Sequence, residues 1–239
     1  MKNSSNKKKS FFLLIGVMMM GAVMRVPFTA IPAVLTDIAA GLGVSVSDLG
    51  ILTSLPLVMF ALCSSLAPGW AARLGLEKLL GLALLVMTAG SLLRIVGVAG
   101  LFLGTILIGI SVAIINVLLP SLVSVHFPLK VGLYTTVYIT MMGLAGTVGS
   151  MVAVPIVEAS SWQTFVILLT LFVGLAALIW LPNWSYNHRF EQASKTTKQG
   201  SLLKNKAALI FGSLSTVVGR WYVSIFSMQS SETLRVLPI

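Results

Sequence analysis

Long apolar runs recur along this chain of 239 residues, and each is about as long as a helix that crosses a lipid bilayer. A transmembrane helix needs about 20 predominantly apolar residues to cover the hydrocarbon core. Only 9% of the residues are charged, whereas a typical soluble domain has about 25%. The sequence therefore predicts an all-α membrane protein.

The apolar runs divide the chain into three regions. Six segments are long enough to be transmembrane helices, and they cover residues 11–31, 49–67, 79–99, 101–122, 131–154 and 162–181. We interpret residues 1–182 as an N-terminal six-helix membrane domain and the polar, basic residues 183–206 as a cytoplasmic linker. Residues 207–239 form an atypical C-terminal segment, in which residues 207–228 are a candidate seventh helix that carries Arg220 near its middle.

Lysines and arginines lie on one side of this arrangement. If the N-terminus is inside, the outer loops carry none, and the inner segments carry Lys2, Lys7, Lys8, Lys9, Arg73, Lys78, Lys130, Arg189, Lys195, Lys198, Lys204 and Lys206. Basic residues are enriched in cytoplasmic loops. The sequence therefore predicts a multi-pass plasma-membrane protein with a cytoplasmic N-terminus. The net charge of +10 reflects this bias and does not indicate nucleic acid binding, because no basic polar domain with interleaved aromatics is present.

Arg25 lies inside the first segment, in the stretch GAVMRVPF, and Arg94 lies inside the third. A charged residue at the centre of a membrane helix costs about 2.5–3.5 kcal/mol on insertion scales, so it normally faces a cavity or a partner. Counted at 1.5 Å per residue from Ser10 and Lys78, both arginines lie about 22–24 Å from the cytoplasmic end. No Asp or Glu lies inside the six segments.

Two guanidinium groups at one depth predict a binding site for a small anion or a small polar molecule, because the planar fork of arginine suits carboxylate-like groups. Structural roles are the alternatives. Arg94 can snorkel to the headgroups, and Arg25 can pair with backbone carbonyls or helix ends.

Three other polar residues are candidate substrate contacts. Thr53 is expected near the depth of the arginines, although its hydroxyl can equally bond its own helix backbone. Asn116 is expected in the inner half, separated from the arginine layer, where a bond between helices is at least as good an explanation. Tyr138 is expected near the inner face, where an interfacial aromatic belt is the default explanation.

Motifs for catalysis are missing from the sequence. There is no HExxH, no intramembrane Asp pair, no GxSxG turn and no Walker-type phosphate loop. We therefore expect no enzymatic activity, no catalytic residue, no metal site and no cofactor.

The loop LAPGWAARLGLEKLLGLALL, residues 66–85, resembles the loop between helices two and three of the major facilitator superfamily. Arg73 and Gly75 match its pattern, whereas Ala72 replaces an Asp, and Leu76 and Glu77 replace basic residues. These departures resemble the cyanate and nitroimidazole transporters, as do LTSLPLVMFAL (52–62), GSLLR (90–94), NVLLPSLV (116–123) and FPLKVGLYTTVY (127–138). The resemblance covers residues 11–182, and no likeness is seen after Lys206.

This resemblance implies half of a major facilitator fold, built from two inverted three-helix repeats, with the substrate site between two such halves. It implies alternating-access transport of a small anion or small polar molecule such as cyanate, with protons as a candidate coupling ion and with arginines where Arg25 and Arg94 lie. We expect a truncated transporter that lacks its C-terminal half. Two alternatives are a half-transporter that works as a homodimer and a membrane fragment or subunit that does not transport.

Overall fold

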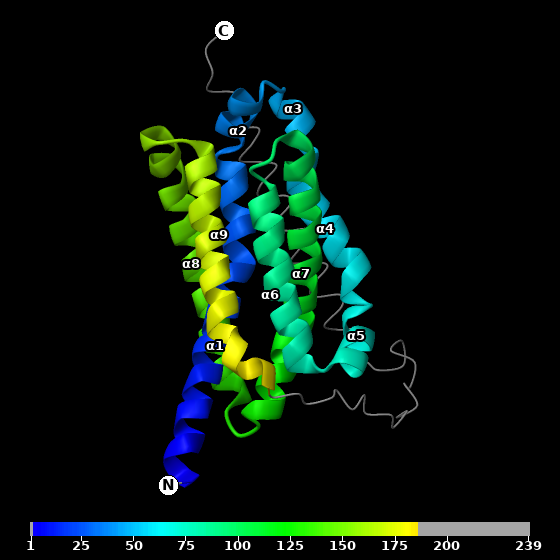
Figure 1. Cartoon of the computed structure of the whole chain (residues 1–239), viewed down its shortest axis with the longest axis vertical. Coiled ribbons are helices and arrows are strands. Elements are labelled where there is room, and N and C mark those ends of the chain that lie inside the picture. The colour runs from blue at the N-terminus through cyan, green and yellow to red at the C-terminus, as the bar shows by residue number, and fades with distance from the viewer. Residues whose placement is uncertain (1, 186–239) are drawn as a thin grey trace, which may run out of the picture. The chain divides into compact units, whose positions relative to one another are not determined.

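A computed structural model describes the backbone of residues 2–185 and the side chains of residues 12–184. Within this range the chain is helical and contains no strand (Figure 1). The helices are α1 (Lys2–Ala33), α2 (Leu35–Leu42), α3 (Val46–Leu49), α4 (Ile51–Ser64), α5 (Ala67–Leu74), α6 (Leu76–Leu93), α7 (Val98–His126), α8 (Val131–Ala159), α9 (Trp162–Trp180) and the 3₁₀ helix η1 (Leu181–Ser185).

The six predicted membrane spans are confirmed in this part of the chain. Six helical stretches are long and apolar enough to cross a bilayer, and they cover Phe12–Ala33, Val46–Ser64, Leu76–Leu93, Val98–His126, Val131–Ala159 and Trp162–Trp184. The end that carries the N-terminus, α5 and the α7–α8 turn is called the basic end here, because Arg73, Lys78 and Lys130 lie there (Figure 1). Helices α2 and α3 lie at the opposite end.

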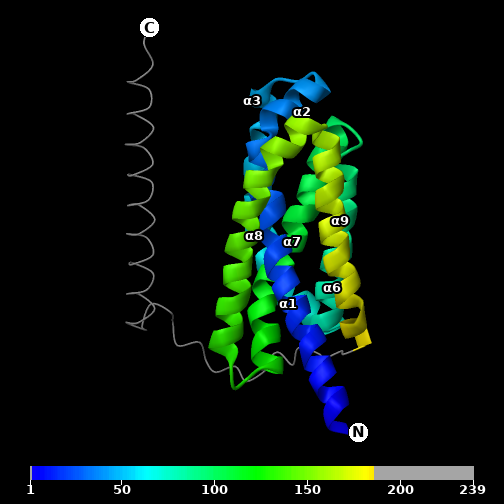
Figure 2. The ribbon, with the colours of Figure 1, turned by 90° about the vertical axis from the view of Figure 1, so that its left-hand side faces the viewer.

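The packing of the spans has the symmetry of two inverted repeats. The most extensive contacts join α1 to α8, α6 to α7, α4 to α7, α6 to α9 and α1 to α9. Figure 2 shows α1 and α8 side by side. When the first three spans (α1, α4, α6) are exchanged with the last three (α7, α8, α9), these pairs map onto one another. Because α1 and α7 run in opposite directions, the repeats are inverted, as in half of a major facilitator fold.

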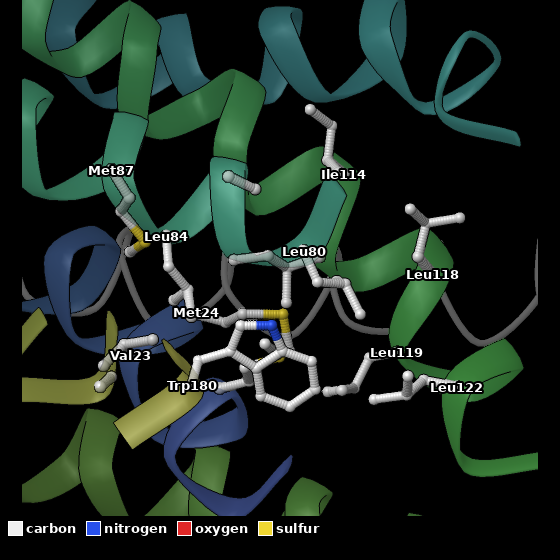
Figure 3. Close-up of a cluster of buried hydrophobic side chains, with 14 of the residues drawn as sticks. Val23, Met24, Leu80, Leu84, Met87, Ile114, Leu118, Leu119, Leu122 and Trp180 are labelled. Atoms are coloured by element: carbon white, nitrogen blue, oxygen red, sulfur yellow. The ribbon is translucent and has the colours of Figure 1, made fainter. Parts of the chain in front are cut away.

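Two apolar clusters form the core of the bundle. One joins α1, α5, α6, α7 and the end of α9, and Figure 3 shows part of it around Trp180, with Met24, Leu80 and Leu84 nearby. The other cluster joins the C-terminal half of α1 to α2, α3 and the beginning of α9. Trp180 is 1% exposed and donates a hydrogen bond from Nε1 to the carbonyl oxygen of Glu77 at 3.0 Å. These contacts hold the spans at fixed rotations, which decides where each polar side chain points.

Two turns depend on glycine. Gly75 has φ 93° between α5 and α6, and Gly97 has φ 103° just before α7. Residues with a Cβ atom rarely adopt such values, whereas glycine does so readily. The glycine of the predicted loop motif therefore has a local structural reason.

The predicted boundary at residue 182 does not coincide with the end of the helical structure. Residues Leu181–Ser185 continue as η1 after α9, and the ring of Trp184 lies against Gly81 of α6. The rest of the predicted linker, residues 186–206, and the segment 207–239 lie outside the described residues.

Candidate functional site

Arg25 lies in the C-terminal half of α1, and its side chain lines a cavity of about 220 Å³. The cavity is formed by α1, α4, α7 and α8. Its lining consists of Met24, Arg25, Phe28, Leu57, Phe60, Val112, Asn116 and Met142. Arg25 is the only charged residue in this lining, and Asn116 is the only other polar one.

The guanidinium of Arg25 is available to a ligand. It makes no hydrogen bond or ion pair with another described residue. A charged side chain within a membrane span is normally directed toward a cavity, water or a partner. The structure places Arg25 in the first of these situations.

Asn116 lines the same cavity as Arg25, which corrects the expectation that the two lie in separate layers. The depth of the Cα atoms places the two residues apart, but each Cα–Cβ bond in a helix tilts toward the helix N-terminus. Helix α1 begins at the basic end and α7 begins at the opposite end, so the side chains of Arg25 and Asn116 tilt toward each other. The length of the arginine side chain reduces the remaining separation.

Arg94 does not share this cavity. It is the C-cap residue of α6, one position beyond the helix, and not an interior helical residue as the sequence had suggested. Its side chain is only 2% exposed, and Nε donates a hydrogen bond to Oγ1 of Thr105 at 3.2 Å. Nη1 is buried without a hydrogen-bond partner among the described residues. The equal depth of the two arginines predicts that they act together. The structure places their side chains in different surroundings.

The remaining predicted contacts also lie outside the cavity lining. Thr53 is exposed in the first turn of α4, and Oγ1 donates to the carbonyl oxygen of Gly50 at 2.8 Å. Tyr138 is 7% exposed and lies on α8 where α1 approaches closely, with Gly21 packed against its carbonyl oxygen. The hydroxyl of Thr53 is used by its own helix backbone, and Tyr138 belongs to the packing of α1 against α8.

The predicted loop motif lies at the basic end, around the α5–α6 turn. Arg73 is in the last turn of α5, where a positive charge is favourable beside the helix C-terminus. Glu77, which departs from the family pattern, is fully buried at the start of α6, and its Oε1 lies 3.4 Å from Nε2 of His126 on α7. This pair joins the two helices below the cavity and is not part of the cavity lining.

Six of the eight lining residues were not predicted. Phe28 and Phe60 supply aromatic walls, and the rest are aliphatic or methionine side chains. One signal in the sequence pointed to part of the lining, because Met24, Arg25 and Phe28 share one face of a helix at spacings of three and four. Apolar residues from the other helices cannot be distinguished from lipid-facing ones by type alone.

Comparison with known proteins decides the family. The sequence pattern of the Major Facilitator Superfamily matches residues 11–234. The chain belongs to this superfamily. The uncharacterized transporter YycB of Bacillus subtilis (strain 168) is 36% identical over 230 residues, which are 95% of this chain and 54% of that protein. The 2-nitroimidazole transporter of Escherichia coli (strain K12) is 38% identical over 183 residues, 76% of this chain and 47% of that protein.

These matches confirm the predicted resemblance to the nitroimidazole transporter branch of the superfamily. They also correct one expectation, because the match to the superfamily continues to residue 234 and does not stop after Lys206. The chain spans about half the length of the relatives it matches.

Proposed function

We propose that the chain is a membrane transport protein and not an enzyme, and that it supplies one wall of a carrier pathway for small planar molecules with oxygen acceptors. Cyanate, small carboxylates and nitro compounds belong to this class. The observation that carries the proposal is the position of Arg25 and Asn116 in one small cavity between the membrane spans.

Arg25 and Asn116 have complementary roles in this proposal. The guanidinium presents two parallel N–H groups to a carboxylate or nitro group, and its positive charge strengthens both hydrogen bonds. The amide of Asn116 can donate or accept a hydrogen bond, so it serves the remaining polar atoms of the substrate. Together these groups favour an anion or a strongly polar acceptor over a cation.

The apolar walls favour a flat substrate. Phe28 and Phe60 suit a flat molecule, because aromatic rings favour offset stacking or edge contacts with planar groups. The volume of about 220 Å³ is the share of the site that this half supplies, because Arg25 and Asn116 are exposed toward the side where a second half is proposed. The Escherichia coli relative is named for 2-nitroimidazole, a small planar ring with a nitro group, and this molecule fits the same description.

A second six-helix half is proposed to complete the pathway. In this superfamily the substrate site lies at the interface of the two halves, which alternate between inward-open and outward-open arrangements. Helices α4 and α8 are the least buried spans of the described bundle, as expected for surfaces that meet another half. A second copy of the chain or a separate C-terminal half can fill this role. We place the basic end in the cytoplasm, at the plasma membrane, and keep protons as the candidate coupling ion.

Uptake into vesicles tests this proposal. Labelled 2-nitroimidazole, cyanate or benzoate is added outside membrane vesicles that contain the full chain, and the same is done for Arg25→Ala and Arg25→Lys. We expect saturable uptake that Arg25→Ala abolishes and that Arg25→Lys reduces, because lysine retains the charge without the planar fork. Uptake by Arg25→Ala equal to that of the unchanged chain would contradict the role of Arg25.

The same membranes distinguish the alternatives. Saturable uptake by a purified homodimer supports the dimeric half-transporter. Binding of 2-nitroimidazole without uptake supports a chain that does not transport by itself and needs a separate second half. Neither uptake nor binding would support a membrane subunit without a substrate site.

A further inference from the structure

We infer that Gly146 of α8 is a positioning residue that sets the direction of the Arg25 side chain. The inference rests on the proposed function, in which Arg25 binds the substrate. The geometric part, a direct contact between position 146 and the stem of Arg25, can be tested without any substrate.

The stem of Arg25 occupies the space where another residue at position 146 would place its side chain. A Cβ atom built on Gly146 would lie 2.6 Å from Cγ of Arg25 and 3.4 Å from its Cβ. Carbon atoms at van der Waals contact are about 3.5–4.0 Å apart. Any side chain at position 146 would therefore push the arginine stem away from α8.

Hydrogen bonds between α1 and α8 oppose a separation of the helices that would make room. The single hydroxyl proton of Thr29 is shared between the carbonyl oxygens of Arg25 and Gly146, each 3.2 Å from Oγ1. The single hydroxyl proton of Ser150 is likewise shared between the carbonyl oxygens of Thr29, 3.2 Å from Oγ, and Gly146, 3.0 Å from Oγ. The backbone at Gly146 is thus tied to α1 within one turn of Arg25, and the flexible arginine side chain is the part that must move.

The three glycines of α8 that are spaced by three residues have different surroundings, so the chain supplies its own controls. A Cβ atom on Gly143 would have no neighbour within 4 Å. A Cβ atom on Gly149 would lie 2.8 Å from Cγ1 of Val26, which is a close contact with the same helix but with an apolar partner. Only Gly146 contacts the charged side chain of the cavity.

A shift of the arginine stem matters because its guanidinium must reach the substrate together with Asn116. Hydrogen bonds weaken steeply as their angles become unfavourable, and the two parallel bonds of an arginine fork need both atoms in place. Gly146 therefore affects substrate binding through Arg25 and not by touching the substrate.

Equilibrium binding of labelled 2-nitroimidazole to the full chain in lipid nanodiscs tests this role, with unsubstituted imidazole as the competitor that lacks oxygens. We expect Gly146→Ala to weaken binding about tenfold, which corresponds to the loss of one good charge-assisted hydrogen bond. Gly143→Ala and Gly149→Ala are expected to bind as the unchanged chain does. Equal losses in Gly146→Ala and Gly149→Ala would overturn the inference, because they would reflect general packing of α1 against α8.

A double-mutant cycle with Arg25→Ala adds a measurement that needs no ligand. Alanine at position 25 has no Cγ atom, so Gly146→Ala should lower the thermal unfolding temperature in the unchanged background and much less in the Arg25→Ala background. Gly149→Ala should lower it equally in both backgrounds. Additive effects of Gly146→Ala and Arg25→Ala would overturn the proposed contact, since coupling is the signature of interacting residues.

The two readouts separate the two claims. If Arg25→Ala binds 2-nitroimidazole normally, the proposed function fails, and the role of Gly146 in binding fails with it, even if the unfolding cycle shows coupling. If Arg25→Ala loses binding and Gly146→Ala does not, only the positioning role is overturned.

Discussion

Arg25 and Arg94 lie in different surroundings, although one lies in a membrane-spanning helix and the other at the end of one. Arg25 is exposed on α1 and lines a cavity with Asn116. Arg94 is buried between the end of α6 and α7, with Thr105 as the acceptor for Nε. A charge within the membrane is costly at both positions, but the directions of the two side chains distinguish a candidate ligand site from a structural one.

The comparison shows what depth along a helix can and cannot decide. The position of a side chain depends on its depth along the helix and on the rotation of the helix about its axis. The depth is similar for the two arginines, whereas the rotation is set by the packing of the apolar clusters. A substitution at Arg25 should therefore change binding, and substitutions around Arg94 should change stability.

The largest expected effect is on binding at Arg25. Arg25→Met removes the charge and keeps much of the apolar stem, so affinity for 2-nitroimidazole should fall about 10- to 100-fold, equivalent to about 1.5–3 kcal/mol for hydrogen bonds to a charged group. Stability should stay the same, because the guanidinium has no partner among the described residues. Calorimetric binding and thermal unfolding of one preparation check both statements, and a large loss of stability would remove the contrast with Arg94.

Thr105→Val should have the next largest effect, and on stability. The substitution keeps the shape of the side chain but removes the acceptor of Arg94 Nε, at a cost of about 1.5–3 kcal/mol for a buried charged donor without a partner. Thr88→Val is the matched control, because its hydroxyl bonds only the carbonyl oxygen of Leu84 in its own helix. Denaturant unfolding in detergent measures both. An equal loss in the two variants would show that Arg94 does not depend on Thr105.

Gly104→Ala should destabilise the α6–α7 contact by about 1–3 kcal/mol, the usual effect of excess volume in a packed core. The new Cβ atom would overlap the carbonyl oxygen of Gly90 and lie 2.9 Å from Cγ of Arg94. At Gly174 the nearest atom, Cγ2 of Thr88, would be 3.6 Å away, so Gly174→Ala is the control. Binding by the folded fraction of Gly104→Ala should be normal, and a selective loss of binding would connect Arg94 to the ligand site.

The smallest effect is expected at Asn116. Asn116→Leu removes one neutral hydrogen-bonding group from the cavity and should weaken binding about fivefold, corresponding to about 1 kcal/mol. Asn116→Gln keeps the amide and should retain more of the affinity. Binding isotherms measure this difference, and unchanged binding by Asn116→Leu would leave Arg25 as the only polar contact of the ligand.

Much of the fold follows from the sequence by simple rules. The length of each apolar run and the one-sided distribution of Lys and Arg gave six spans, and the structure has six in the described residues. Gly75 could also be expected from its motif, and its positive φ gives the reason. These features depend on composition and local geometry, which a single sequence contains.

The site was only partly predictable for physical reasons. The cost of a buried charge identified Arg25, and the polarity of Asn116 made it a candidate. Its placement beside Arg25 depends on side chains that tilt toward opposite ends of antiparallel helices, which Cα depth does not capture. The rings of Phe28 and Phe60 carry no signal that distinguishes a cavity wall from a lipid-facing surface.

The most direct test of the account compares Arg25→Met with Arg94→Met in the same binding experiment. Labelled 2-nitroimidazole is titrated onto nanodiscs that contain each variant, and affinities are referred to the folded protein in each sample. We expect Arg25→Met to lose most of the affinity and Arg94→Met to bind as the unchanged chain does, because Arg94 is buried against Thr105 and does not line the cavity. Loss of binding in Arg94→Met, or normal binding in Arg25→Met, would contradict it.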